Sequence, residues 1–169
     1  DLLESRGLGD VYKRQDMFAA NSSVPVINAL SDLSHPCQIL ADLMTFKENS
    51  INELEKVCWI GDGNNVCNSY IEASKMLNFE LSIYCPKEYS PNHSFLDYAK
   101  ENSSFANSRE EAAKGADIIT TDVWVSMGDE KTKERAFEGY FVDTELIENT
   151  GKKSICLLYT SDAADDQLG

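Results

Sequence analysis

Residues 56–65 read Lys56-Val-Cys-Trp-Ile60 and then Gly61-Asp-Gly-Asn-Asn65, an apolar run followed directly by a turn-forming sequence. A short run of β-branched and aromatic residues that ends at a glycine predicts a strand. Amphipathic spacing over 66–77 predicts a helix after the turn, and residues 80–85 and 117–121 predict two further strands. Strands that alternate with helices indicate an α/β fold, a Rossmann-like three-layer arrangement around a parallel sheet.

The flanking segments extend this pattern in both directions. The β-branched run at 24–28 predicts a strand with a proline near its start, and a helix is expected from Pro36 to Asn49. Further helices are expected at 94–101, 108–115, 130–137 and 144–148, and a last strand begins at 154–155.

Composition narrows the class of protein. A net charge of −14 argues against a nucleic-acid binder, which would carry clustered Lys and Arg. No apolar run approaches the roughly 20 residues of a membrane span. The N-terminal residues show no basic segment followed by an apolar core, so we do not expect a signal peptide. The five cysteines include no C-x-x-C pair, so they are interpreted as reduced thiols of a cytoplasmic protein.

The two ends differ from the interior. Residues 11–15 (VYKRQ) can be encoded by GTG TAT AAG AGA CAG, and residues 156–161 (CLLYTS) by TGT CTC TTA TAC ACA TCT. These strings are reverse complements over most of their length, as a transposon-end adapter would be on either side of a sequenced fragment. We therefore expect residues 1–15 and 156–169 to be non-native, adapter-like extensions, with natural terminal extensions as the alternative.

The first candidate site segment is His35-Pro-Cys-Gln38, at the expected start of a helix. His35 and Gln38 are three residues apart and would lie on one face of the first turn, near the positive end of the helix dipole. An imidazole and an amide placed there could donate hydrogen bonds to a polar carbonyl compound. Taken alone, the tetrapeptide is more often an ordinary helix start.

The second candidate is the G-D-G-N-N turn, which invites a comparison with dinucleotide-binding loops. Val66 replaces the third glycine of G-x-G-x-x-G, and the next strand ends at Cys85 without an acidic residue for a ribose hydroxyl. The nucleotide interpretation is therefore rejected. The amides of Asn64 and Asn65 would suit a zwitterionic amino acid, although turn chemistry explains them equally well.

The third candidate is the stretch of residues 122–128 (DVWVSMG), directly after the strand expected at 117–121. A carboxylate at Asp122 could pair with an ammonium group, and Ser126 and the backbone of Met127 could add polar contacts. Taken alone, a capping aspartate would be the simpler interpretation. In a parallel sheet this segment and residues 61–65 lie at the same edge, where ligands bind.

Together these segments resemble the ornithine carbamoyltransferase family. The resemblance rests on VPVINALSDLSHPCQILADLMTF (24–46), WIGDGNNV (59–66) and TDVWVSMG (121–128), in the family's order and spacing, and it covers 16–155. H-P-x-Q with L-A-D-L is shared with aspartate carbamoyltransferases, whereas GDGNN with S-M-G points to ornithine. The resemblance implies the end of a carbamoyl-phosphate domain and a linking helix at 16–48, and a partial, incomplete ornithine-binding domain at 49–155.

The resemblance also implies the chemistry. The reaction would transfer the carbamoyl group of carbamoyl phosphate to the δ-amine of L-ornithine, giving L-citrulline and phosphate, as in arginine biosynthesis and the urea cycle. No metal or organic cofactor would take part, and the parent enzyme would be a homotrimer or a multiple of trimers. His35 and Gln38 would contact carbamoyl phosphate, and Asn65, Asp122, Ser126 and Met127 would bind ornithine, with His35 and Asp122 as the catalytic pair.

Two elements of the family are missing from this sequence, the S-T-R-T phosphate-binding loop and the H-C-L-P segment. Cys156-Leu-Leu158 echoes the second but lacks its His and Pro. We therefore predict that the 169-residue chain is catalytically inactive, because the phosphate-binding groups are absent. Purified chain that forms citrulline faster than a His35→Ala control would contradict this prediction.

Two alternatives remain from the sequence. One is a related carbamoyltransferase that acts on another amine, such as putrescine or an acylated ornithine, which substrate profiling would distinguish. The other is a non-catalytic domain that binds an amino acid, which micromolar binding of ornithine in calorimetry would favour.

Overall fold

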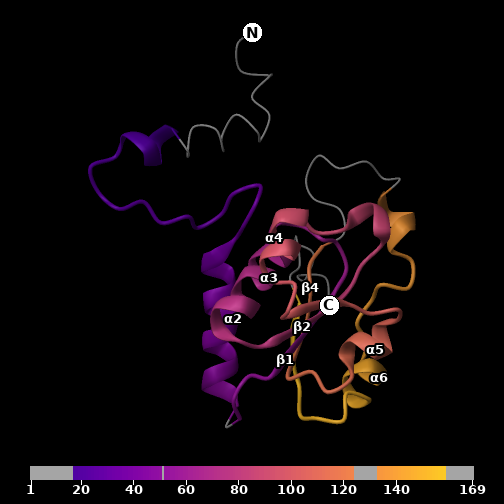
Figure 1. Ribbon diagram of the computed structural model, residues 1–169. Coiled ribbons are helices and arrows are strands. Elements are labelled where there is room, and N and C mark those ends of the chain that lie inside the picture. Colours follow the sequence, from indigo (N-terminus) through magenta and orange to yellow (C-terminus); the bar gives the residue numbers. More distant parts are fainter. Residues whose placement is uncertain (1–16, 51, 124–132, 159–169) are drawn as a thin grey trace, which may run out of the picture.

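A five-stranded parallel sheet with helices on both faces forms the body of the protein (Figure 1). The computed structural model describes residues 17–50, 52–123 and 133–158. The strand order is β3-β2-β1-β4-β5, and every neighbouring pair is parallel. The predicted α/β fold is therefore confirmed. The strands are β1 (Lys56–Ile60), β2 (Glu80–Tyr84), β3 (Ser103–Phe105), β4 (Ile118–Thr121) and β5 (Ile155–Leu158).

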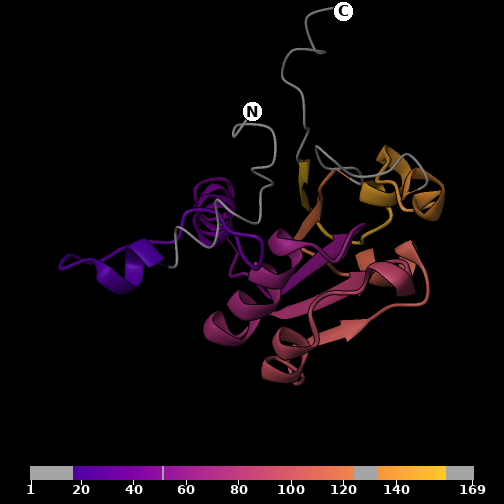
Figure 2. The same ribbon diagram turned by 90° about the horizontal axis from the view of Figure 1, so that it is seen from above.

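The central strand β1 is apolar on both sides because helices cover both faces of the sheet. Val57 and Trp59 pack into one core, beneath the larger helices. Cys58 and Ile60 point the other way, into a second core that includes Leu146. Figures 1 and 2 show the two helical layers. Helices α2 (Pro36–Asn49), α3 (Asn65–Leu77) and α4 (His93–Tyr98) cover one face, and α5 (Arg109–Ala113) and α6 (Thr144–Glu148) cover the other.

Most predicted elements agree with the structure within a few residues. The capping sequence at 108–111 behaves as expected, since the Ser108 side chain accepts a hydrogen bond from the Glu111 backbone N–H. A helix was predicted at 130–137, and the described part of this segment forms a 3₁₀ turn, η2 (Lys133–Phe137). Another 3₁₀ turn, η1 (Lys87–Tyr89), lies in the loop after β2.

One prediction of local structure was wrong, and one strand was not predicted. Residues 24–28 form no strand, and Val24, Val26 and Ile27 are exposed. A strand needs a neighbour that completes its hydrogen bonds, and none of the described strands lies beside this segment. Strand β3 was not predicted, because three residues reading Ser-Ser-Phe are too short and too polar to show an alternating pattern.

Residues 17–35 extend away from the sheet and return to it at the start of α2 (Figures 1 and 2). Several of their large apolar side chains are exposed, including those of Phe18 and Leu33. Within the described residues, no helix combines the length and the apolar composition that a membrane crossing requires.

Strand β5 continues past the predicted boundary at 155/156. Cys156, Leu157 and Leu158 pair with β4 in parallel register. This pairing does not test whether residues 156–169 are native, because any sequence without proline can supply these backbone hydrogen bonds. Both predicted boundaries therefore stay predictions.

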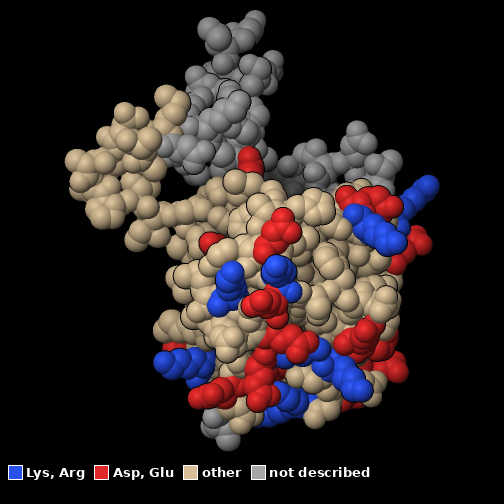
Figure 3. Space-filling model, viewed as in Figure 1, with Lys and Arg blue, Asp and Glu red and all other residues tan. Residues whose placement is uncertain are grey.

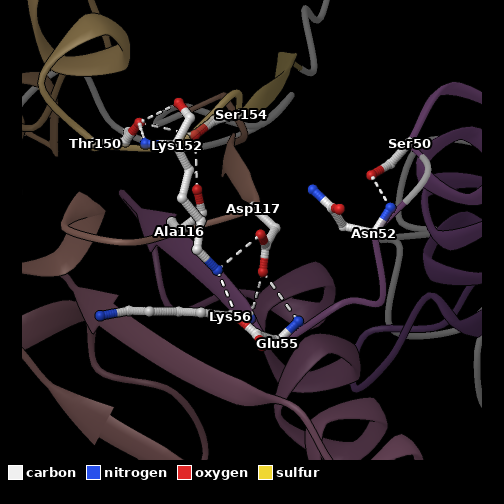
Figure 4. Close-up of polar contacts among 9 residues, drawn as sticks. All are labelled: Ser50, Asn52, Glu55, Lys56, Ala116, Asp117, Thr150, Lys152 and Ser154. Atoms are coloured by element: carbon white, nitrogen blue, oxygen red, sulfur yellow. Dashed lines mark hydrogen bonds and ion pairs between the residues drawn. The ribbon is translucent and has the colours of Figure 1, made fainter.

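The edge of the sheet where the strands begin is held together by Asp117 (Figure 4). Asp117 Oδ2 accepts hydrogen bonds from the backbone N–H groups of Glu55 and Lys56, both at 2.9 Å. Lys152 Nζ lies 3.1 Å from Asp117 Oδ1 and 2.6 Å from Glu55 Oε2. Ser154 Oγ donates to the backbone carbonyl of Ala116 at 2.6 Å. These contacts join the beginnings of β1, β4 and β5. The candidate site described below lies at the opposite edge of the sheet, where the strands end.

Candidate functional site

The candidate site lies where the strand order changes direction. From β1 the chain continues to β2 and β3 on one side, and then crosses back to β4 on the other side of β1. In open parallel sheets such a switch point leaves a crevice beyond the carboxyl ends of the two strands. The turn 61–64 follows β1, and Asp122 follows β4 directly. The predicted convergence of these two segments is therefore confirmed.

A short hydrogen bond joins the two segments. Asn64 Nδ2 donates to Asp122 Oδ2 at 2.7 Å, and the backbone N–H of Val123 donates to Asp122 Oδ1 at 2.7 Å. Asn64 is the N-cap of α3, and its Oδ1 accepts from the backbone N–H groups of Val66 at 3.0 Å and Cys67 at 3.1 Å. The Asp122 carboxylate is thus held at the N-terminus of α3 by two donors.

The next residues of α3 hold the segment that leads to His35. Asn65 Nδ2 donates to the carbonyl of Ser31 at 2.7 Å. The backbone N–H of His35 donates to Ser69 Oγ at 2.7 Å, and Ser69 Oγ donates in turn to the carbonyl of Asn65 at 3.0 Å. The first turns of α3 therefore contact the 31–35 segment and the Asp122 carboxylate at once.

The imidazole of His35 lies at the start of α2. His35 is the N-cap residue of this helix, yet its side chain makes no capping hydrogen bond. Its Nδ1 atom is buried and has no hydrogen-bond partner within the described part of the chain. A buried ring nitrogen without a partner is costly, and a ligand group placed against it would remove that cost.

Gln38 lies in the first turn of α2 and is linked to α3 indirectly. Its Nε2 donates to Asp42 Oδ1 at 3.2 Å, and Tyr70 OH donates to Asp42 Oδ2 at 2.6 Å. Asp42 is buried. Among the described residues no hydrogen bond joins the Gln38 side chain to His35, Asn65 or Asp122, so Gln38 borders the site without a direct link to it.

The structure therefore places Asn65 at the start of α3 and brings Asp122 and the backbone of His35 into hydrogen-bond contact with the beginning of this helix. Gln38 is linked to α3 only through Asp42 and Tyr70. The remaining two predicted residues, Ser126 and Met127, lie outside the described residues. Sequence reasoning did not single out Asn64 from its neighbour, and it missed Asp42. The signal for Asn64 was its place immediately before an amphipathic helix, which is where capping residues stand.

The turn after β1 is closed to a nucleotide. The backbone N–H of Gly63 donates to the carbonyl of Tyr89 at 2.8 Å. A Cβ atom at Gly63 would lie 2.3 Å from Pro91 N and 2.5 Å from Tyr89 O, so only glycine fits beneath this loop. The loop covers the glycine, and Asn64 already satisfies two of the free N–H groups of α3 that a phosphate would need. This geometry supports the rejection of dinucleotide binding.

The buried thiols of Cys58 and Cys67 and the half-buried thiol of Cys85 are poor nucleophiles. Burial raises the pKa of Cys58 to about 12 and that of Cys85 to about 11, and it raises the pKa of Cys67 above its ordinary value. These three thiols are protonated at neutral pH, and a thiol attacks only as the thiolate. Across residues 17–50, 52–123 and 133–158, no three His, Cys, Asp or Glu side chains are grouped to hold a metal ion.

The charge on the face shown in Figure 3 does not suit a nucleic acid. On the face shown in Figure 3, Lys and Arg side chains are interspersed with Asp and Glu, and the described residues form no continuous basic area there. A nucleic-acid interface would present clustered positive charge to the phosphates.

Comparisons with known proteins agree with this geometry. The family model for "Aspartate/ornithine carbamoyltransferase, Asp/Orn binding domain" matches residues 54–158, and the one for "carbamoyl-P binding domain" matches residues 1–48. The ornithine carbamoyltransferase of Geobacter metallireducens is 48% identical over 138 residues, covering 77% of this chain and 46% of that protein. The enzyme of Acinetobacter baumannii strain AYE is 47% identical over 152 residues, covering 87% and 49%.

A solved structure shows the same fold. The anabolic ornithine carbamoyltransferase of Campylobacter jejuni is similar with a TM-score of 0.77 and 34% sequence identity, covering 94% of this chain and 62% of that one. The present chain spans about half the length of the curated relatives it matches.

Proposed function

Because this chain belongs to the aspartate/ornithine carbamoyltransferase family, we propose that it forms part of an ornithine carbamoyltransferase. The observation that carries this proposal is the meeting of Asp122, the Asn64-Asn65 turn and the 31–35 segment around the N-terminus of α3. One substrate would be an amino acid bound by amides and a carboxylate. The other would be carbamoyl phosphate, next to His35.

We propose that the ornithine half of the site is built on Asp122 and Asn65. A carboxylate that accepts hydrogen bonds from Asn64 and from the backbone N–H of Val123 is placed to pair with an ammonium group of the substrate. The Asn65 amide has both donor and acceptor capacity for the rest of the zwitterion. Ser126 and Met127 would complete this half, as the family resemblance implies.

We propose that the carbamoyl half is built on His35 and Gln38. The neutral δ-amine of ornithine attacks the carbamoyl carbon, the C–O bond to phosphate breaks, and the amine loses a proton, giving citrulline and inorganic phosphate. Negative charge develops on the carbamoyl oxygen during attack, and a preorganised N–H donor stabilises it. The buried Nδ1 atom of His35, which has no hydrogen-bond partner among the described residues, supports such a role for the imidazole.

We further propose a cytoplasmic enzyme that works as a homotrimer or a multiple of trimers. Five free cysteines support a reducing compartment. The trimer is an expectation from the family resemblance, and sedimentation of a complete enzyme would measure it.

The proposed function can be tested in a hybrid enzyme, in which a relative provides the segments that this chain does not match. In a hybrid enzyme, residues 16–155 replace the matching segment of the Acinetobacter baumannii enzyme. We expect the hybrid to form citrulline, with kcat/KM for ornithine well above the values for putrescine and N-acetylornithine. A cooperatively melting hybrid that prefers putrescine would favour the alternative amine, and one that forms no product would contradict the proposal.

A further inference from the structure

We propose that Asn64 is a positioning residue of the ornithine site, which fixes the carboxylate of Asp122 for the substrate; this inference rests on the proposed function. Asn65 and Asp122 remain the residues that we propose to contact ornithine, and Asn64 is not proposed to contact it. It acts through Asp122, with which it shares a 2.7 Å hydrogen bond.

The orientation of the Asn64 side chain is set by α3. Its Oδ1 accepts two backbone N–H groups of the first turn, at 3.0 Å and 3.1 Å. With Oδ1 held in this way, the amide can rotate little, and its Nδ2 is directed away from the helix towards Asp122. A helix of 13 residues packed on the sheet therefore serves as the rigid support for one hydrogen bond to a loop residue.

Helix capping alone does not explain an asparagine at this position. Ser, Thr, Asp and Asn all cap helices well, because capping requires only a side-chain oxygen. The described helices of this chain use several of them, with Asn92 before α4, Ser108 before α5 and Asp143 before α6. Ionised Asp has no donor, and in Ser or Thr one oxygen atom must serve as both acceptor and donor; among these four side chains only the amide of Asn gives the helix an oxygen and a carboxylate an N–H group on a separate atom. The contact with Asp122 accounts for the choice at residue 64.

The second donor to Asp122 comes from its own loop. The backbone N–H of Val123 holds Oδ1, and Asn64 holds Oδ2, so both oxygens of the carboxylate are fixed. A carboxylate oxygen can accept more than one hydrogen bond, so the bond from Asn64 is compatible with a bond from an ammonium group to the same carboxylate. Without Asn64, one oxygen would lose its anchor on α3, and the carboxylate would have to be ordered when the substrate binds.

The test uses two substitutions that keep the cap and remove the donor, both in the hybrid enzyme. Asn64→Ser keeps a capping oxygen but is too short to reach Asp122. Asn64→Asp keeps the cap and the shape, but it sets a second carboxylate against Asp122. Asn92→Asp is the matched control, because Asn92 is also an N-cap asparagine and its side chain accepts hydrogen bonds from Ser94 alone among the described residues.

We expect Asn64→Ser to raise the KM for ornithine about tenfold or more, the effect of losing one hydrogen bond to a charged group. Asn64→Asp should raise it further at neutral pH. The KM for carbamoyl phosphate should change less than twofold in both, and both melting temperatures should stay as close to the parent as that of Asn92→Asp.

The pH dependence separates positioning from a structural effect. In Asn64→Asp the two adjacent carboxylates would share a proton as the pH falls, which restores a donor between them. Asp62 is the other described carboxylate of this turn, and it is present in every variant. The ratio of the ornithine KM of Asn64→Asp to that of the parent should therefore fall between pH 8 and pH 6, whereas the ratio for Asn64→Ser should stay constant.

The outcomes for Asn64 and for the proposed function are distinct. If Asp122→Asn raises the ornithine KM while both Asn64 variants stay within twofold of the parent, the positioning role is wrong and the site stands. If Asp122→Asn has no effect either, the proposed ornithine site is wrong, and the inference falls with it. If the Asn64 variants raise both KM values or lower the melting temperature strongly, Asn64 is a structural residue only.

Discussion

Replacing Asp117 with alanine is expected to lower the free energy of unfolding of the 169-residue chain by about 3 kcal/mol. Asp117 is only 4% exposed, and its carboxylate accepts hydrogen bonds from the backbone N–H groups of Glu55 and Lys56 at the start of β1. Alanine would leave both donors without an acceptor at the point where three strands begin. Urea unfolding followed by tryptophan fluorescence would measure the loss, since Trp59 is buried in the core.

The two kinds of contact at Asp117 can be separated. Lys152 is an exposed cation, and it also pairs with Glu55, so its ion pair with Asp117 should contribute less than about 1 kcal/mol. We therefore expect Lys152→Met to be mild and Asp117→Asn, which keeps one carbonyl oxygen, to be intermediate. Asp97→Ala, in the exposed side of α4, is the control and should be neutral. Equal losses for Lys152→Met and Asp117→Ala would show that the ion pair dominates instead.

The parts of the fold that follow from local sequence were predictable. Residues 57–60 form a continuous apolar run because the central strand is buried on both faces. The helices at 36–49 and 65–77 have clear periodicity and clear starts. The prediction of a strand at 24–28 was wrong because strand formation does not depend on local sequence alone. Its residues have β-branched side chains, but pairing depends on a neighbouring strand, which no local pattern reveals.

The candidate site was predictable only to the level of segments. The meeting of the turn 61–65 with Asp122 follows from the parallel sheet, since the carboxyl ends of neighbouring strands share one edge. The division of work between Asn64 and Asn65 does not follow from sequence, because two adjacent asparagines in a turn look alike. Coordinates distinguish them: one caps α3 and holds Asp122, and the other holds the carbonyl of Ser31. The link from Gln38 to Tyr70 through Asp42 also depends on how two helices pack.

Replacing Asp122 with asparagine in the hybrid enzyme is expected to lower kcat/KM for ornithine by a factor of about 10²–10³. Asparagine preserves the shape of the side chain and can still accept from the backbone N–H of Val123. It removes the negative charge that we propose for the ammonium group of the substrate. It also sets an amide against the Asn64 amide in place of the 2.7 Å contact with a carboxylate. Steady-state kinetics with both substrates varied would measure the loss.

A substrate analogue distinguishes the group that Asp122 contacts. In 5-aminopentanoate the reacting amine and the carboxylate remain, and only the α-amino group is missing. If Asp122 holds the α-ammonium group, the parent hybrid should use this analogue poorly, and Asp122→Asn should change its kcat/KM by less than about threefold. If Asp122 acts on the reacting amine instead, the substitution should reduce the activity with both compounds by the same factor. An Asp122→Asn hybrid that keeps the parent's kcat/KM for ornithine would contradict both roles, because a charge that contacts either amine cannot be removed without a loss of that size.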